Sequence, residues 1–337
     1  MKISCIEEKD GATMYLMEND LLKVYLTNFG ASIYNVQMKE ADGGVTDLTA
    51  TCDSLESFLQ NRVYFGATVG RTINRIKGAA FTLGNKRYPI TANSGRNHSN
   101  GGKIGFSFRL WEPVMLEDGV RFCLHSPSGD EGFPGNLDVT ATYRFDAQGA
   151  IEITYTAISD HDTPFSLTNH TYWTLGGAGK KIYPQELRVF ARYYLETDSE
   201  LLPTGQILWA KGTPFDFSQP TVLEPNLKKL PPPLRRTGGY DVSFVRRDSP
   251  KNRAAELFDP ESGRRLAVET NMPIIHLYTA NFLKDFPGKD GKVFGPHDAL
   301  CLEASYYPDA IHHPHFGMAV LKANQMQTDY IRFIITR

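Results

Sequence analysis

Hydrophobic and polar residues alternate with a period of two along much of this chain. In residues 137–145 an apolar side chain occupies every second position, and the pattern resumes at 151–157 after a turn that contains Gly149. Two such segments joined by a short glycine-containing loop predict a β-hairpin. The same alternation occurs at residues 34–38, 187–195, 266–268 and 331–335. The pattern therefore predicts strands towards both ends of the chain as well as in its middle.

Helix signals are few. The clearest lies at residues 53–60, where Asp53 is expected to cap the first turn and Glu56 to reach back to it. The 29 glycines and 20 prolines interrupt the chain at short intervals, which favours many antiparallel strands over βαβ units. Residues 228–236 contain three consecutive prolines and are predicted to form a surface loop. We expect an all-β fold, a large antiparallel β-sandwich with few short helices, in which residues 1–337 form a single domain.

The charge balance argues against a polyanionic partner. The chain has 36 Lys and Arg against 38 Asp and Glu, and it has no long basic run, so nucleic-acid binding is not expected. Charged residues lie within the first eight positions, where a secretory signal would need apolar ones, and no uncharged apolar run approaches the roughly 18 residues needed to cross a bilayer. These features predict a cytoplasmic protein with no membrane partner.

The four cysteines are far apart in the sequence. They form no C-x-x-C pair, which argues against both a disulfide framework and a zinc knuckle. Buried free thiols in a reducing compartment are the favoured interpretation. The four are Cys5, Cys52, Cys123 and Cys301.

Polar side chains gather beside glycines or aromatic residues in five places where a plain sandwich core would not need them. Of these, Glu303 is the hardest to explain structurally, because it lies mid-strand between apolar residues and a buried carboxylate is costly unless it is paired or functional. His170 is surrounded by aromatic residues and has a side chain that titrates near neutral pH, although a hydrogen-bonded core histidine is an alternative. The five clusters are residues 70–76, 97–102, 168–173, 238–241 and 300–309.

The other clusters suggest binding groups. Arg71 follows an apolar segment, so its guanidinium is expected at the sheet surface, offering donors to hydroxyl oxygens, with a surface ion pair as the alternative. Asp241 follows an aromatic residue, a combination that suits sugars because carboxylates accept from vicinal hydroxyls while rings cover C–H faces; a turn-forming Asp is the alternative. The glycine-rich loop at 97–102 contains His98 and suits close approach to a small polar ligand, but it is a weak signal alone.

A histidine-rich segment near the C-terminus invites a metal interpretation, which we do not favour. Adjacent histidines in an extended segment point to opposite sides, and no carboxylate or histidine partner stands at a suitable spacing. We predict a polar loop and no metal site. The residues are His312, His313 and His315.

Taken together and in this order, the clusters resemble the signature of the aldose 1-epimerases, also called galactose mutarotases. The resemblance runs from about residue 28 to the last predicted strand. It rests on G-R-x-x-N-R-I at 70–76, N-H-x-x-G-G at 97–102, D-E-G-F-P-G-N-L at 130–137, N-H-T-Y-W at 169–173, L-P-T-G-Q-I at 202–207, G-Y-D at 239–241, Y-T-A-N-F-L at 278–283 and L-E-x-x-x-Y-P-D-A at 302–310. It implies a β-sandwich of the galactose mutarotase type (supersandwich) whose open cleft binds a monosaccharide. It also implies interconversion of the α and β anomers of a free aldose such as galactose or glucose, with no metal and no cofactor.

The resemblance implies a role for particular residues. Glu303 would be the general base and His170 the general acid. Binding of the sugar hydroxyls and ring oxygen would fall to Arg71, His98 and Asp241, and Tyr172 and Phe282 would flank the site. The chain departs from the family pattern at neighbouring positions, which leaves the preferred sugar open; these positions are Asn100, Val242, Ser243, His276 and Ser305.

Three other functions fit part of the pattern. A glycoside hydrolase would use Glu303 and Asp241 as paired carboxylates and leave His170 without a role. A non-catalytic carbohydrate-binding protein would need the aromatic residues but no acid and base. A hexose-6-phosphate 1-epimerase would need a cluster of arginines on the phosphate, for which the candidates are Arg71, Arg75 and Arg96. A monomer and a homodimer both fit the sequence.

Overall fold

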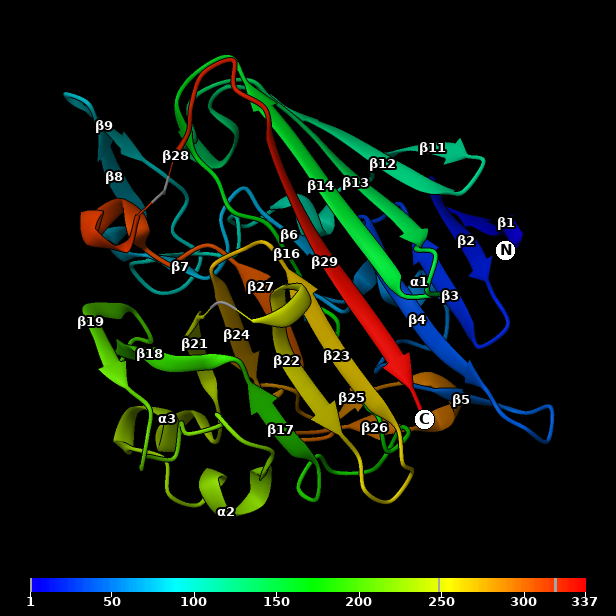
Figure 1. Cartoon of the computed structure of the whole chain (residues 1–337). Helices are drawn as coiled ribbons and strands as arrows, with labels where there is room; N and C mark the ends of the chain where they lie inside the picture. Colours follow the sequence, from blue (N-terminus) through cyan, green and yellow to red (C-terminus); the bar gives the residue numbers. More distant parts are fainter. Residues whose placement is uncertain (1, 248, 318–319) are drawn as a thin grey trace.

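The computed structural model describes residues 2–247, 249–317 and 320–337. Its largest sheet has nine antiparallel strands, which cross the front of the view in Figure 1. In spatial order they are β11 (Glu112–Leu116), β12 (Gly119–Ser126), β13 (Leu137–Phe145), β14 (Ile151–Ser159), β29 (Gln327–Thr336), β23 (Arg265–Thr270), β22 (Arg253–Phe258), β17 (Glu186–Val189) and β20 (Thr221–Val222).

Two five-stranded antiparallel sheets accompany the large sheet. The first consists of β1 (Lys2–Lys9), β2 (Ala12–Glu18), β3 (Leu22–Thr27), β4 (Ser32–Lys39) and β5 (Val45–Asp47), in that order. The second has the order β19 (Pro203–Trp209), β18 (Ala191–Thr197), β21 (Asp241–Arg246), β24 (Ile274–Tyr278) and β27 (Cys301–Ser305).

Short ribbons and helices connect these sheets. The two-stranded ribbons pair β6 (Thr68–Val69) with β16 (Thr168–Asn169), β7 (Arg75–Ile76) with β10 (His98–Ser99), β8 (Ala80–Leu83) with β9 (Lys86–Pro89), β15 (Thr163–Pro164) with β28 (Val320–Leu321), and β25 (Phe286–Pro287) with β26 (Val293–Phe294). The α-helices are α1 (Leu55–Gln60), α2 (Leu223–Leu227) and α3 (Pro232–Thr237). Within the described residues, no helix combines the length and apolar character that a membrane span requires.

The main hydrophobic core lies between the large sheet and the two smaller ones. Buried apolar residues from all three sheets form one continuous cluster. Tyr15 of β2 packs against Phe122 of β12, and Trp173 packs against Phe333 of β29, with ring centroids 5.9 and 4.9 Å apart. Because the side chains of a strand alternate between faces, this packing leaves the other face of β21, β24 and β27 free to form a site.

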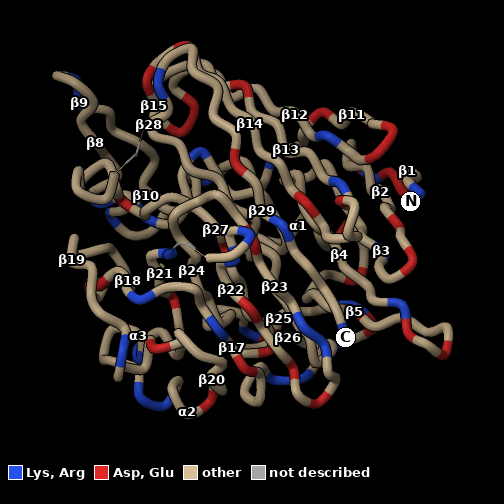
Figure 2. Tube along the Cα trace, in the orientation of Figure 1, with Lys and Arg blue, Asp and Glu red and all other residues tan. Residues whose placement is uncertain are grey.

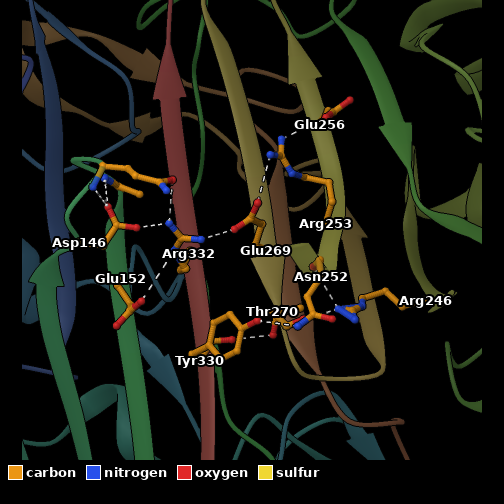
Figure 3. A network of polar contacts seen from close by, with 12 residues as sticks. Asp146, Glu152, Arg246, Asn252, Arg253, Glu256, Glu269, Thr270, Tyr330 and Arg332 are labelled. Carbon is orange, nitrogen blue, oxygen red and sulfur yellow. Dashed lines mark hydrogen bonds and ion pairs between the residues drawn. The ribbon is translucent and has the colours of Figure 1, made fainter. Parts of the chain in front are cut away.

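A ladder of charged side chains crosses the outer face of the large sheet (Figure 3). The side chain of Glu269 on β23 is 1% exposed and lies between Arg332 of β29, with which it forms an ion pair, and Arg253 of β22, at 3.1 Å. Arg332 also pairs with Asp146 and Glu152. The buried carboxylate of Glu269 is therefore compensated by an arginine on each side. Over the molecule as a whole, positive and negative residues are interspersed (Figure 2).

The strand predictions from periodicity are confirmed. Residues 137–145 and 151–157 form the hairpin of β13 and β14, with Phe145 opposite Ile151. The segment 187–195 is strand throughout except at Phe190, where it passes from β17 in one sheet to β18 in another.

Two local predictions are wrong. Helix α1 exists, but its N-cap is Ser54, whose side chain accepts a hydrogen bond from the Ser57 amide, whereas Asp53 accepts from the amide of Asp290. The proline-rich segment at 228–236 is not wholly a loop, because most of it belongs to α3. Proline suits the first turn of a helix, where its missing N–H is not needed.

Candidate active site

A cavity of about 170 Å³ opens on the face of β21, β24 and β27 that is turned away from the main core. These three strands contribute Asp241, His276 and Glu303, respectively. Ser243 is paired with His276, and His276 with Glu303, across neighbouring strands. The three strands thus place two carboxylates and an imidazole side by side on one surface.

Glu303 reaches the cavity because of the period of its strand. Its neighbours Leu302 and Ala304 are buried in the main core, so Glu303 points to the opposite face. It lines the cavity although the residue is only 5% exposed. The sequence signal for this residue, a carboxylate within an apolar strand, therefore corresponds to a buried position at the wall of a cavity.

His170 is held in place by the backbone around it. Its amide donates to the Ala67 carbonyl at 2.9 Å, its carbonyl accepts from the Gly66 amide at 3.0 Å, and the Asn169 side chain donates to the Gly66 carbonyl at 2.7 Å. A Cβ atom at Gly66 would lie 1.8 Å from the carbonyl oxygen of Ile33, so this close approach requires glycine. These contacts fix Asn169 and His170, the first two residues of the N-H-T-Y-W motif, against the loop before β6.

The His170 imidazole faces Glu303 on one side and Cys301 on the other. Its Nε2 atom lies 3.5 Å from Oε1 of Glu303, and its Nδ1 atom lies 3.5 Å from Sγ of Cys301. Burial raises the pKa of the Cys301 thiol well above its usual value, so the sulfur is a neutral thiol at physiological pH. The ring also packs against three tyrosines, Tyr172, Tyr64 and Tyr278, at centroid distances of 4.9, 5.8 and 5.9 Å. Little freedom is left to the imidazole.

Asp241 is fixed by two cationic neighbours. Its Oδ1 accepts from Nε2 of His276 at 3.0 Å, and its Oδ2 lies 3.9 Å from a guanidinium nitrogen of Arg75. Burial alone would raise the pKa of Asp241, but the hydrogen bond from His276 and the charges of Arg75 and His276 outweigh burial and hold the pKa below its usual value. The carboxylate is therefore ionised and able to accept from hydroxyl groups.

The structure does not place Arg71 in the cavity, and it corrects the expectation that the Arg71 guanidinium lies at the sheet surface. It is 2% exposed, and its guanidinium donates to Ser126, to the Pro127 carbonyl and to the Pro134 carbonyl. Burial lowers the pKa of Arg71 to about 10, so it stays charged at neutral pH. With its donors used inside the protein, Arg71 ties the 126–134 loop to the fold. Arg75, four positions later, lines the cavity in its stead.

His98, predicted to contact the sugar, is likewise absent from the cavity lining. It is 0% exposed, its Nδ1 donates to the Thr91 carbonyl at 2.8 Å, and its ring packs against Phe133. Because side chains alternate along the short strand β10, His98 faces inward. Ser99 and Asn100 line the cavity.

The two aromatic residues named from the sequence both line the cavity. Tyr172 is buried and its hydroxyl donates to the Val63 carbonyl at 2.8 Å, so its ring rather than its hydroxyl faces the site. Phe282 is 58% exposed at the rim and is stacked on Tyr278. A polar site with aromatic walls of this kind suits a sugar.

Sequence reasoning assigned no sugar contact to three residues of the lining, Arg75, Asn100 and His276. The sequence nevertheless marks all three positions. Arg75 lies in the G-R-x-x-N-R-I motif, Asn100 lies in the N-H-x-x-G-G motif, and His276 is one of the departures from the family pattern. Of the other departures, Val242 packs in the main core and Ser305 is fully buried on β27.

Potential metal ligands in the described residues converge only at His170, Cys301 and Glu303, whose donor atoms lie within 4.8 Å of one another. Cys301 and Glu303, however, contact different ring nitrogens of His170. This arrangement suits two separate hydrogen bonds better than three bonds to a single ion. In the histidine-rich segment, His312 pairs with Asp309, while His313 and His315 contact the carbonyl oxygens of Pro203 and Gly205.

An imidazole and a carboxylate meet in an aromatic-walled cavity on an antiparallel β-sandwich, an arrangement that suits an enzyme acting by acid–base chemistry on a sugar. Residues 13–333 match the aldose 1-epimerase family model, and the chain belongs to that family of carbohydrate isomerases. It is 37% identical over 314 residues to galactose mutarotase from Bos taurus, covering 92% of this chain and 90% of that protein. It is 31% identical over 302 residues to aldose 1-epimerase from Escherichia coli, covering 89% and 87%.

Solved structures agree with this assignment. An aldose epimerase homologue from C. elegans superimposes with a TM-score of 0.88 at 27% identity, covering 95% of this chain and 98% of that one. Galactose 1-epimerase from Lactobacillus acidophilus gives a TM-score of 0.85 at 27% identity, covering 99% and 98%. The family and the fold implied by the sequence resemblance are both confirmed.

Proposed function

We propose that this protein interconverts the α and β anomers of a free aldose such as galactose or glucose, with Glu303 as general base and His170 as general acid. The observation that carries the proposal is the 3.5 Å separation of His170 Nε2 and Glu303 Oε1 at the wall of one cavity. The anomeric hydroxyl and the ring oxygen of an aldose are bonded to the same carbon. An acid and a base that serve both atoms must therefore lie close together.

The reaction needs two proton transfers and no redox step. The Glu303 carboxylate takes the proton of the anomeric hydroxyl while the His170 imidazolium gives a proton to the ring oxygen, and the bond from C1 to the ring oxygen breaks. The aldehyde end of the open chain rotates. Closure on the other face reverses both transfers, so that His170 regains its proton and Glu303 gives one up.

Sugar binding falls to the groups that line the cavity. Asp241 accepts hydrogen bonds from hydroxyl groups, and Arg75 and Asn100 donate to hydroxyl oxygens. The rings of Tyr172 and Phe282 cover the C–H faces of the sugar. Arg71 and His98 have no part in this proposal.

Competing functions are less well supported. Both carboxylates of the hydrolase hypothesis line the cavity, but His170 would have no role there, and the family match is to epimerases. Of the three arginines named for a phosphate, only Arg75 lines the cavity, because Arg71 is buried elsewhere and Arg96 pairs with Glu200. A free sugar is favoured by the match to aldose 1-epimerases rather than by the arginines alone, since Arg62 also lines the cavity.

We also propose a domain organisation, a cellular location and an oligomeric state for the enzyme. A single domain over residues 1–337 is supported by one core cluster that includes residues from Tyr15 to Ile335. A cytoplasmic location is supported by the cysteines, all four of which are free thiols; Cys52 and Cys301 are buried, Cys123 is half-buried and Cys5 is exposed. The enzyme is expected to act as a monomer or a homodimer.

Polarimetry tests the activity. Purified protein added to freshly dissolved α-D-galactose, α-D-glucose or L-arabinose should speed the change in optical rotation without altering its end point. Parallel incubation with a disaccharide should release no monosaccharide, and glucose 6-phosphate should be a poorer substrate than glucose. A rate equal to that of buffer for all three free sugars would refute the proposal, and monosaccharide release would favour the hydrolase.

A further inference from the structure

A chain of three polar side chains ends at the sugar-binding carboxylate. His276 on β24 places Nδ1 2.8 Å from Oγ of Ser243 and Nε2 3.0 Å from Oδ1 of Asp241, both on the neighbouring strand β21. All three residues are buried, being 5%, 4% and 7% exposed for His276, Ser243 and Asp241. His276 and Asp241 line the cavity.

Both nitrogens of the His276 ring have partners within the protein. The ring therefore has no N–H group left to donate to a sugar hydroxyl. Asp241, in contrast, uses Oδ1 for His276 and keeps Oδ2 at the cavity wall beside Arg75. The influence of His276 on a bound sugar must pass through Asp241.

We propose that His276 is a positioning residue for sugar recognition, which holds Asp241 in the orientation and the ionised form in which Oδ2 accepts from a sugar hydroxyl. Ser243 in turn fixes the rotation of the His276 ring. This inference rests on the proposed function, because it assigns a task within the same site. His276 is not a catalytic residue in this account.

The charges around His276 support this role. The groups that face it are Asp241 from β21, Glu303 from β27, Arg75 from β7 and His170 from the segment after β16. Burial acts to lower the pKa of His276, but the hydrogen bond to Asp241 and the charges of Glu303 and Asp241 outweigh it and raise the pKa above its usual value. A protonated His276 forms a charge-assisted hydrogen bond with Asp241, about twice as strong as a neutral one.

The consequence appears on the acid side of the pH profile. With His276 present, the pKa of Asp241 lies below its usual value, so Asp241 accepts hydrogen bonds down to low pH. Without His276, part of the influence that opposes burial is lost, so Asp241 would take up a proton at higher pH than in the wild type. A protonated Asp241 accepts fewer hydrogen bonds from the sugar, so KM should rise as the pH falls.

Two substitutions separate orientation from charge. His276→Leu removes both, and we expect KM and the Kd for D-galactose to rise by about tenfold at pH 8, the effect of losing one hydrogen bond to a charged carboxylate. His276→Gln keeps an N–H group for Asp241 without the charge. At pH 8 we expect the KM of His276→Gln to rise less than that of His276→Leu. As the solution is acidified, the KM of His276→Gln should begin to increase at a higher pH than the KM of the wild type. For both variants the change should fall on KM more than on kcat.

Controls keep a folding defect apart from the proposed role. Ser243→Ala leaves His276 in place but frees its ring, and it should raise KM by a smaller factor than His276→Leu. His125 forms a comparable pair with Asp138, at 2.7 Å, but on the surface, so His125→Gln should match the wild type at every pH. Thermal unfolding of each variant shows whether it is folded.

The outcomes distinguish this inference from the proposed function. An active wild type whose KM, Kd and acid-side dependence are unchanged in both His276 variants would overturn the positioning role alone. A fall in kcat at constant KM would also overturn it, because His276 would then act on the chemistry. A wild type that neither binds D-galactose nor speeds its mutarotation would refute the proposed function, and this inference with it.

Discussion

The Nδ1 atom of His170 lies 3.5 Å from Sγ of Cys301, so the proposed acid contacts a thiol on the side of the ring opposite to Glu303. The thiol sits two positions before Glu303 on the same strand, and both point to the same face of β27. Sulfur is a weak hydrogen-bond acceptor. It nevertheless stabilises the N–H group of an imidazolium more than an apolar neighbour would.

Cys301→Ala should therefore remove a polar contact that holds the His170 ring in place. We expect kcat to fall by roughly threefold to tenfold, as for the loss of about 1 kcal/mol. Cys301→Ser, which keeps a polar atom beside the ring, should lower kcat less. Cys52 is a second buried thiol in the same apolar cluster, so Cys52→Ala is the matched control. Equal kcat values for Cys301→Ala and Cys52→Ala would argue against any role for the Cys301 thiol.

The two arginines of the G-R-x-x-N-R motif should behave in opposite ways. Arg75→Gln removes a donor from the cavity wall and should raise KM by about tenfold or more with little loss of stability. Arg71→Gln leaves several buried carbonyl acceptors without their partner, and it should lower the free energy of unfolding by about 2 to 3 kcal/mol without changing KM. Polarimetric KM values and urea unfolding of both variants provide the check. If Arg71→Gln raised KM while Arg75→Gln did not, the placement of the two side chains would be wrong.

The charge ladder of the large sheet should contribute to stability because its central carboxylate is buried. Glu269→Gln leaves Arg253 and Arg332 without a shared charged partner. It should lower the free energy of unfolding, measured by urea denaturation, by about 3 kcal/mol. Asp118 pairs with Arg144 at an exposed site, so Asp118→Asn should cost less than about 1 kcal/mol. Equal effects of the two substitutions would mean that burial does not set the strength of the ladder.

The Asp146 carboxylate should make the free energy of unfolding depend on pH in the acidic range. Burial alone would raise the pKa of Asp146, but the hydrogen bond from Arg332 and two backbone amides outweigh it and lower the pKa in the folded state. Its contribution is therefore complete above about pH 4, the range of an unfolded Asp, and is lost as the pH falls through the folded value. Unfolding free energies at pH 7 and pH 3 should differ less for Asp146→Asn than for the wild type. An identical difference in both proteins would contradict the assignment.

The sequence predicts the fold well because the period of strands is a local property. It also singles out Glu303 and His170, which line one cavity, since a carboxylate within an apolar strand and a histidine among aromatic residues are visible without the fold. It does not predict that Arg71 and His98 lie outside the cavity lining, because nothing local distinguishes a guanidinium that turns inward from one that turns outward four residues later. The chain of Ser243, His276 and Asp241 depends on the register of β21 against β24, which only the assembled sheet defines.

Acid–base catalysis by Glu303 and His170 is tested most sharply by the rate of anomer interconversion by Glu303→Gln and His170→Asn, alone and combined, together with sugar binding by calorimetry. Each single substitution should lower kcat by about 10² to 10⁴-fold while D-galactose still binds. The double variant should lose less than the product of the two single losses, because the two groups act on one hemiacetal. Variants of either residue that keep the wild-type kcat would show that Glu303 and His170 are not the acid and base.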